Sequence, residues 1–103
     1  MPPDHRLELP EDFDAEAPIT EAKGWYPCAV LVVGGERYRV MFYDPVRLGQ
    51  DVAADLQTAP FFFEPNVVIV AGLTRANLEA AAAALAASGR YRSLAPMRDD
   101  ASR

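Results

Sequence analysis

The feature that most constrains the fold of this sequence is a pair of β-rich runs separated by two glycines. "YPCAVLVV" begins at Tyr26, "GG" occupies positions 34 and 35, and "ERYRVMFY" ends at Tyr43. Two successive glycines can both adopt positive φ, as the type I′ and II′ turns of two-residue hairpins require. The pattern therefore predicts an antiparallel β-hairpin that turns at Gly34 and Gly35.

The two-residue turn also fixes the register of the hairpin. Val33 is expected to pair with Glu36, and an unbroken ladder then pairs Cys28 with Met41. Cross-strand partners share a face, and one of the two faces is almost wholly apolar, so we expect it to be the core. The other face mixes arginines with apolar groups and consists of Tyr26, Cys28, Val30, Val32, Arg37, Arg39, Met41 and Tyr43.

The stretch after the hairpin predicts a helix. Asp44 is a good N-cap and Pro45 is well suited to the first helical position. Gly49 weakens the first turn, so the regular part of the helix is expected nearer Gln50. Apolar residues at i, i+4 and i+8 predict one apolar helical stripe, which is Leu48, Val52 and Leu56.

A strand, a second helix and a last strand are predicted further along. Residues 66–70 form a short apolar run, typical of a strand covered on both faces. The following Ala-rich stretch predicts a helix with Thr74 as N-cap and Gly89 just past its end. Residues 91–94 predict the last strand. The buried stripe of this second helix is expected to be Leu78, Ala81 or Ala82, and Leu85.

The resulting order, ββαβαβ, predicts an α+β fold. We expect a two-layer α/β sandwich, in which a mixed sheet of about four strands carries two helices on one face. With only two helices, the other sheet face has no helical cover. The arginine-bearing face of the hairpin is expected to be this open face.

The chain divides into three segments by composition. Residues 1–23 hold seven acidic and two basic residues, a net charge of −5, and four prolines. They are interpreted as a flexible or draped acidic arm without a core of its own. Residues 24–95 are expected to form a single α/β domain, and residues 96–103 a polar tail.

Charge and composition disfavour several functional classes. Residues 24–103 hold eight acidic and eight basic residues, and an acidic arm beside a neutral body suits neither nucleic acid nor an anionic membrane. One cysteine excludes an internal disulfide, and no apolar stretch resembles a signal peptide or a membrane span, so a cytoplasmic protein is expected. Nine arginines against one lysine, with many alanines, are typical of a GC-rich bacterial genome.

No group of catalytic residues is apparent. The one histidine, His5, lies in the acidic arm, away from Ser88 and Ser93, so a catalytic triad is not expected. Cys28 is interpreted as a small buried or half-buried residue, although nearby arginines could make it a reactive nucleophile. We expect no metal site and no cofactor, because the metal-ligating residue types are not clustered.

The best alternative site is the start of the second helix. Backbone N–H groups near Ala76, helped by Thr74 and Arg75, could hold a small anion. Asp44 also follows a strand and could lie at the same sheet edge, where ligands of α/β folds bind. Ordinary capping explains the same residues, and the alternative hypothesis is a small-ligand binder or an enzyme.

Three successive aromatics, Phe61, Phe62 and Phe63, cannot all point to one face of an extended chain. At least one is expected to meet solvent, a partner or the N-terminal segment, and Phe62 is assigned to the interaction surface. A purely structural interpretation places Phe61 and Phe63 at the core edge, with Phe62 on a helix or on Trp25.

These observations favour a non-enzymatic protein–protein interaction module, such as a homodimer, an adaptor or an immunity-like protein. Tyr, Met and Arg are enriched in interface cores, and the open face offers all three. A second copy, another protein or the N-terminal segment could cover it, and the last would bring acids near Arg37 and Arg39. Alternatively, arginine stems simply lie over the valines with their charged ends in water. The interaction surface is predicted to comprise Tyr26, Val30, Val32, Arg37, Arg39, Met41, Tyr43 and Phe62.

Overall fold

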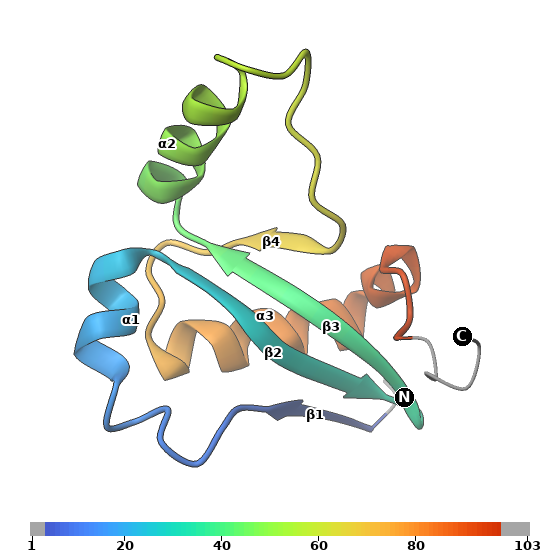
Figure 1. Ribbon diagram of the computed structural model, residues 1–103. Coiled ribbons are helices and arrows are strands. Elements are labelled where there is room, and N and C mark those ends of the chain that lie inside the picture. Colours follow the sequence, from blue (N-terminus) through green and yellow to red (C-terminus); the bar gives the residue numbers. More distant parts are fainter. Residues whose placement is uncertain (1–3, 98–103) are drawn as a thin grey trace.

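The computed structural model describes residues 4–97 of the chain and shows an α+β fold (Figure 1). A four-stranded mixed sheet has the order β1-β2-β3-β4, with β1 to β3 antiparallel and β4 parallel to β3. The elements in chain order are β1 (His5–Glu8), α1 (Ala17–Lys23), β2 (Trp25–Val33), β3 (Glu36–Tyr43), α2 (Pro45–Asp55), β4 (Val67–Ile69), α3 (Arg75–Ser88) and a 3₁₀ turn, η1 (Arg90–Ser93).

The predicted hairpin is confirmed. Gly34 and Gly35 both have positive φ, 59° and 87°, as a type I′ turn requires. Val33 pairs with Glu36, and the predicted register holds as far as Ala29, which pairs with Val40.

The register breaks beyond Ala29, where the unbroken ladder was expected to continue. Tyr26 pairs with Phe42, so Pro27 and Cys28 together lie opposite the single residue Met41. This is a β-bulge, and a proline without an N–H suits it because the bulged residues leave the ladder. Every residue before the bulge therefore lies on the opposite face from the one that the unbroken register predicts.

The core lies between one face of the sheet and α3. Ala29, Leu31 and Val40 are fully buried from the hairpin, and α3 contributes Leu78 and Ala82. Alanines on the buried side of α3 allow the helix to lie close to the strands. The structure thus fits the predicted two-layer α/β sandwich, although the predicted element order is not matched in detail.

The predicted caps of α3 are confirmed. Thr74 Oγ1 accepts a hydrogen bond from the Asn77 amide at 3.1 Å, and Gly89 ends the helix in the left-handed conformation. Leu73 and Leu78 are both completely buried, as expected of a hydrophobic staple. The buried residues of the helix are Leu78, Ala82 and Ala86, with Ala81 and Leu85 partly buried.

Residues 4–23 contain regular structure that the sequence analysis did not predict. β1 adds an edge strand to β2, and Leu7 and Phe13 belong to the hydrophobic core. These positions form a paired strand and a short helix rather than a flexible segment, and they share the core of the sheet instead of having one of their own. β1 has a single core-facing leucine, and α1 has no side-chain cap, so neither gives a strong sequence signal. The division of the chain at residue 23 stays a prediction.

The helix α2 begins at Pro45, with the Asp44 carboxylate accepting a hydrogen bond from the Arg47 amide at 2.7 Å. The expectation that its regular part starts nearer Gln50 is therefore wrong. None of its residues is buried. Of the predicted apolar stripe, Leu48 and Val52 are half-buried and Leu56 is exposed. In Figure 1, α2 and the connection to β4 form an arch beyond the end of the sheet.

Two further expectations are corrected. Residues 91–94 do not form a strand, because Arg90–Ser93 is a 3₁₀ turn whose Tyr91 packs edge-on against Tyr38. β4 is not covered on both faces, since Ile69 is half exposed at the sheet edge.

Most of the predicted polar tail lies outside the described residues. Among those described, no helix is long and apolar enough to cross a membrane.

Candidate interaction surface on the open sheet face

The strand register places charged side chains in rows across the open sheet face. Arg6, Val32 and Arg37 form one row across β1, β2 and β3. Glu8, Val30 and Arg39 form the next row, and the two valines are half-buried between the charged strands.

Arg37 is held by an acidic residue of the N-terminal segment. Its guanidinium donates to the two carboxylate oxygens of Glu8 at 2.8 and 3.2 Å, and Arg6 donates to the same carboxylate at 2.6 Å. Hydrogen bonds from Arg6 and then Arg37 lower the pKa of Glu8 below its usual value. One of the two predicted arginines therefore belongs to an exposed ion-pair cluster, which contributes little to stability.

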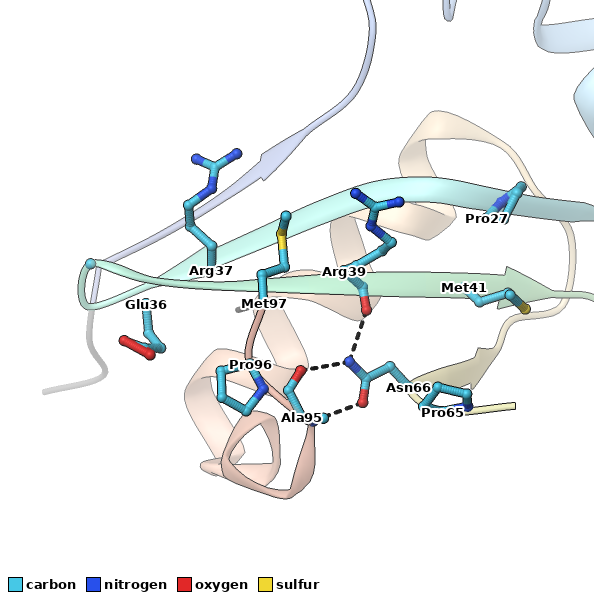
Figure 2. A pocket seen from close by; sticks show the side chains of 11 residues that line it. Pro27, Glu36, Arg37, Arg39, Met41, Pro65, Asn66, Ala95, Pro96 and Met97 are labelled. Atoms are coloured by element: carbon cyan, nitrogen blue, oxygen red, sulfur yellow. Dashed lines mark hydrogen bonds between the residues drawn. The ribbon is translucent and has the colours of Figure 1, made fainter. Parts of the chain in front are cut away.

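Arg39 is different, because its guanidinium makes no side-chain hydrogen bond or ion pair with residues 4–97. Its side chain is exposed and lines an open groove of about 990 Å³ (Figure 2). Met41 and Pro27 continue the groove toward the bulge, and Glu36 lies at the turn end. The groove is lined by Pro27, Gly35, Glu36, Arg37, Arg39, Met41, Pro65, Asn66, Ala95, Pro96 and Met97.

The far wall of the groove is built by Asn66 and the chain that follows η1. The Asn66 amide group donates to the carbonyls of Arg39 at 2.9 Å and Ala95 at 2.8 Å, and its side-chain oxygen accepts from the Ala95 amide at 2.8 Å. The Met97 amide then donates to the Arg37 carbonyl at 2.8 Å. One asparagine thus joins the edge of β3 to the C-terminal segment (Figure 2).

Tyr26 and Tyr43 are not exposed on the predicted interaction surface, each for a different reason. The bulge turns Tyr26 to the core face, where its ring packs edge-on against Phe13 at 5.4 Å between centroids. Tyr43 does lie on the open side of β3, but α2 covers it and leaves it only 3% exposed. Its hydroxyl donates to Asp51 at 2.8 Å, and burial together with this bond raises the pKa of Tyr43 to about 12.

The aromatic run lies mainly in solvent. Phe61 and Phe63 are exposed, so their expected place at the core edge is wrong, and Phe62 is half-buried. None of the three lines the groove. The predicted interaction residues that the groove brings together are therefore Arg37, Arg39 and Met41.

The residues of the alternative anion site are engaged in contacts within the chain. Thr74 and Asp44 each cap their own helix. Arg75 donates to Asp14 at 2.9 Å, which raises the pKa of its guanidinium, and it also lies over the Phe13 ring. None of the three lines the groove.

Potentially catalytic groups are scattered over the described residues. His5 is exposed on β1 and Cys28 is exposed at the bulge, so the expectation that Cys28 is buried or half-buried is wrong. Ser88 hydrogen-bonds within the end of α3. Within residues 4–97, no three His, Cys, Asp or Glu side chains lie close enough together to hold a metal ion.

Sequence reasoning missed Asn66 and Met97, which line the groove. It placed acids of the N-terminal segment near Arg37 and Arg39 as one alternative, but did not single out Glu8, which binds Arg37. Asn66 follows Pro65 directly before an apolar run, which is a turn signal, and it has a positive φ of 59° that asparagine tolerates. The acidic composition of the N-terminal segment suggested a contact with the arginines of β3 without naming the residue, and nothing in the sequence near Met97 indicates that it reaches β3. The contacts of Asn66 and Met97 with β3 form only because the segments that carry them fold back against the sheet.

No protein-family model matches this chain, and no significant match was found among curated proteins or solved structures. The site therefore has to be interpreted from its own geometry.

Proposed function

We propose that this chain is a non-enzymatic protein–protein interaction module whose groove binds an extended, acidic segment of another protein. The observation that supports this proposal is the position of Arg39, whose guanidinium lies over the groove without a partner among residues 4–97. A carboxylate of the bound segment would supply that partner through a charge-assisted hydrogen bond.

The groove walls suit the apolar neighbours of such a carboxylate. Met41 and Met97 supply flexible, polarisable side chains, which adapt to varied partners, and Pro27, Pro65 and Pro96 supply rigid apolar surface. Glu36 at the turn end would repel an acidic residue there, so the carboxylate belongs near Arg39. The single cysteine and the arginine- and alanine-rich composition support placing this role in the cytoplasm of a bacterium.

Selection from a random peptide library displayed on phage tests the proposal. The full-length chain should enrich peptides that carry Asp or Glu beside apolar residues. Arg39→Glu should weaken binding of the enriched peptides at least about fivefold, because an exposed ion pair is worth up to about 1 kcal/mol and the new charge repels.

Arg90→Glu is the matched control. It makes the same change of charge at an exposed arginine of η1 that does not line the groove, and it should leave peptide binding unchanged. The proposal fails if no peptide is enriched, or if the enriched peptides bind wild type and Arg39→Glu equally well.

A further inference from the structure

The arch between β3 and β4 carries most of the large apolar side chains that the described residues expose. Val46, Leu56, Phe61, Phe63 and Ile69 are between 50% and 73% exposed, and all lie between positions 46 and 69. The sixth exposed residue of this kind, Ile19, lies on α1. Scattered apolar residues are normal on a surface, but their concentration in one segment marks an interface.

The way α2 is attached leaves one side of it without a partner. Arg47 stacks over Trp25 and donates to Asp51 at 2.9 Å, and Asp51 accepts from Tyr43 at 2.8 Å, so these two residues face inward. No residue of α2 is buried. A helix of this length is marginal without tertiary packing, so a cover on its outer side would stabilise it.

The outer side of α2 has the spacing of a helix–helix seam. Val46, Gly49, Ala53 and Leu56 are all exposed, at intervals of three, four and three residues, which is the a/d pattern of paired helices. An antiparallel pair of α2 helices would place Val46 opposite the partner's Leu56, and Gly49 opposite the partner's Ala53. Small residues at the centre let two helices approach closely, and the same pairs recur on both sides of the axis, as a two-fold interface requires.

The charges on α2 also permit self-association. The seam itself is uncharged, and Arg47 and Asp51 bind each other on the inner side. At 1.5 Å per residue, an antiparallel pair centred at position 51 separates the two copies of Asp55 by about 12 Å along the axis. Two copies of the chain can therefore meet here without placing like charges together.

The exposed area is of the right size for a dimer. Taking on the order of 200 Å² for a large apolar side chain, the four exposed residues of the arch itself, Val46, Leu56, Phe61 and Phe63, offer roughly 500 Å² per copy. Two copies would cover about 1,000 Å² of apolar side chain, and surrounding polar atoms would bring the total within the range of about 1,200–2,000 Å² for specific interfaces.

We infer that the arch surface formed by α2, Phe61 and Phe63 binds a second copy of this chain, with the two α2 helices antiparallel. This dimer leaves the groove at Arg39 open, because none of the arch residues named here lines the groove. The inference does not depend on the proposed function.

Sedimentation velocity on the full-length chain over a wide concentration range tests the inference. Wild type should change from one to two chain masses as concentration rises. Leu56→Glu and Ala53→Glu should each raise the dissociation constant of the dimer at least about a hundredfold, because each buries an unpaired charge in the seam.

Ile19→Glu is the matched control, since Ile19 is 51% exposed and Leu56 is 50% exposed, but Ile19 lies outside the arch. It should dimerise like wild type. A wild type that is monomeric at every concentration overturns the inference. A dimer that survives Leu56→Glu and Ala53→Glu overturns it as well, and separation of that dimer by Arg39→Glu would assign it to the open sheet face.

Discussion

Gly24 links α1, β2 and the start of α2 at a single position. It ends α1 in the left-handed conformation, with φ of 71°, and its carbonyl accepts a hydrogen bond from the Asp44 amide at 2.9 Å. A Cβ at this position would lie 2.5–2.8 Å from the atoms of the Asp44 carboxyl group. The position therefore needs glycine both for its backbone and for its lack of a side chain.

We expect Gly24→Ala to lower the free energy of unfolding by about 2–3 kcal/mol. The left-handed backbone costs an alanine about 1–2 kcal/mol, and displacing Asp44 weakens the cap of α2 by about a further 1 kcal/mol. Urea unfolding measures the change. Gly72→Ala is the control, because its Cβ would meet only Asn77 at an ordinary 3.8 Å, and it should stay within about 0.5 kcal/mol of wild type.

The two arginines of β3 show that the contacts of a single residue can depend on distant parts of the chain. Alternation along the strand correctly predicted that Arg37 and Arg39 share a face. Their different roles depend on Glu8, which is 29 positions before Arg37 in the sequence and reaches only that arginine of the two. A pairing of this kind cannot be inferred from local pattern, because it requires the register of β1.

At the level of elements, the bulge at Pro27 and Cys28 decides which side of the sheet the start of β2 faces. Because side chains alternate along a strand, one extra residue exchanges the two faces. Tyr26 reaches the core through this exchange, and Trp25 lies beside Tyr43 on the other side.

Deletion of Cys28 should remove the bulge but leave Tyr26 opposite Phe42, because Pro27 alone would then lie opposite Met41. The two faces of β2 keep their residues, so we expect the free energy of unfolding to stay within about 1 kcal/mol of wild type. Circular dichroism and urea unfolding would show it. Cys28→Ala keeps the chain length at an exposed position and should be close to neutral. A loss of about 3 kcal/mol or more in the deletion variant, as for removal of a large core side chain, would contradict this account of the bulge.

Elements with strong local signals could be predicted from the sequence, and elements held by distant contacts could not. The turn of the hairpin and the caps of α3 depend on a few neighbouring residues, and the structure confirms them. The bulge carried a readable signal, a proline inside a strand. The position of α2 gave no such sequence signal. Arg47 and Asp51 anchor this helix to Trp25 and Tyr43, whereas its apolar stripe does not attach it to the sheet.

For the whole molecule, Asn66 closes the sheet edge between two distant segments. Its side chain bridges β3 and Ala95 through three hydrogen bonds, beside the Met97 amide that bonds Arg37. The candidate groove has this bridge as its wall. Sequence reasoning found three of its residues on β3, but not the wall, which forms only when the chain returns to β3 after α3.

Asn66→Gly should lower the free energy of unfolding by about 1–3 kcal/mol, since it keeps the positive φ but removes the three side-chain hydrogen bonds. Asn66→Ala should cost about 1 kcal/mol more, because alanine disfavours that φ. Urea unfolding gives both values. Hydrogen exchange of the Met97 amide should quicken in both variants, and unchanged exchange would show that the bridge does not hold the segment.

The contact between Gly24 and Asp44 has a consequence for tracing the ancestry of this chain. The two positions are twenty residues apart, on either side of the whole hairpin, and neither can change alone without loss of stability. Distant relatives should therefore retain a glycine before the hairpin and an Asp-Pro pair after it, even where the strands between have diverged. A search profile weighted on these positions and on the paired glycines of the turn would recognise such relatives where overall similarity does not.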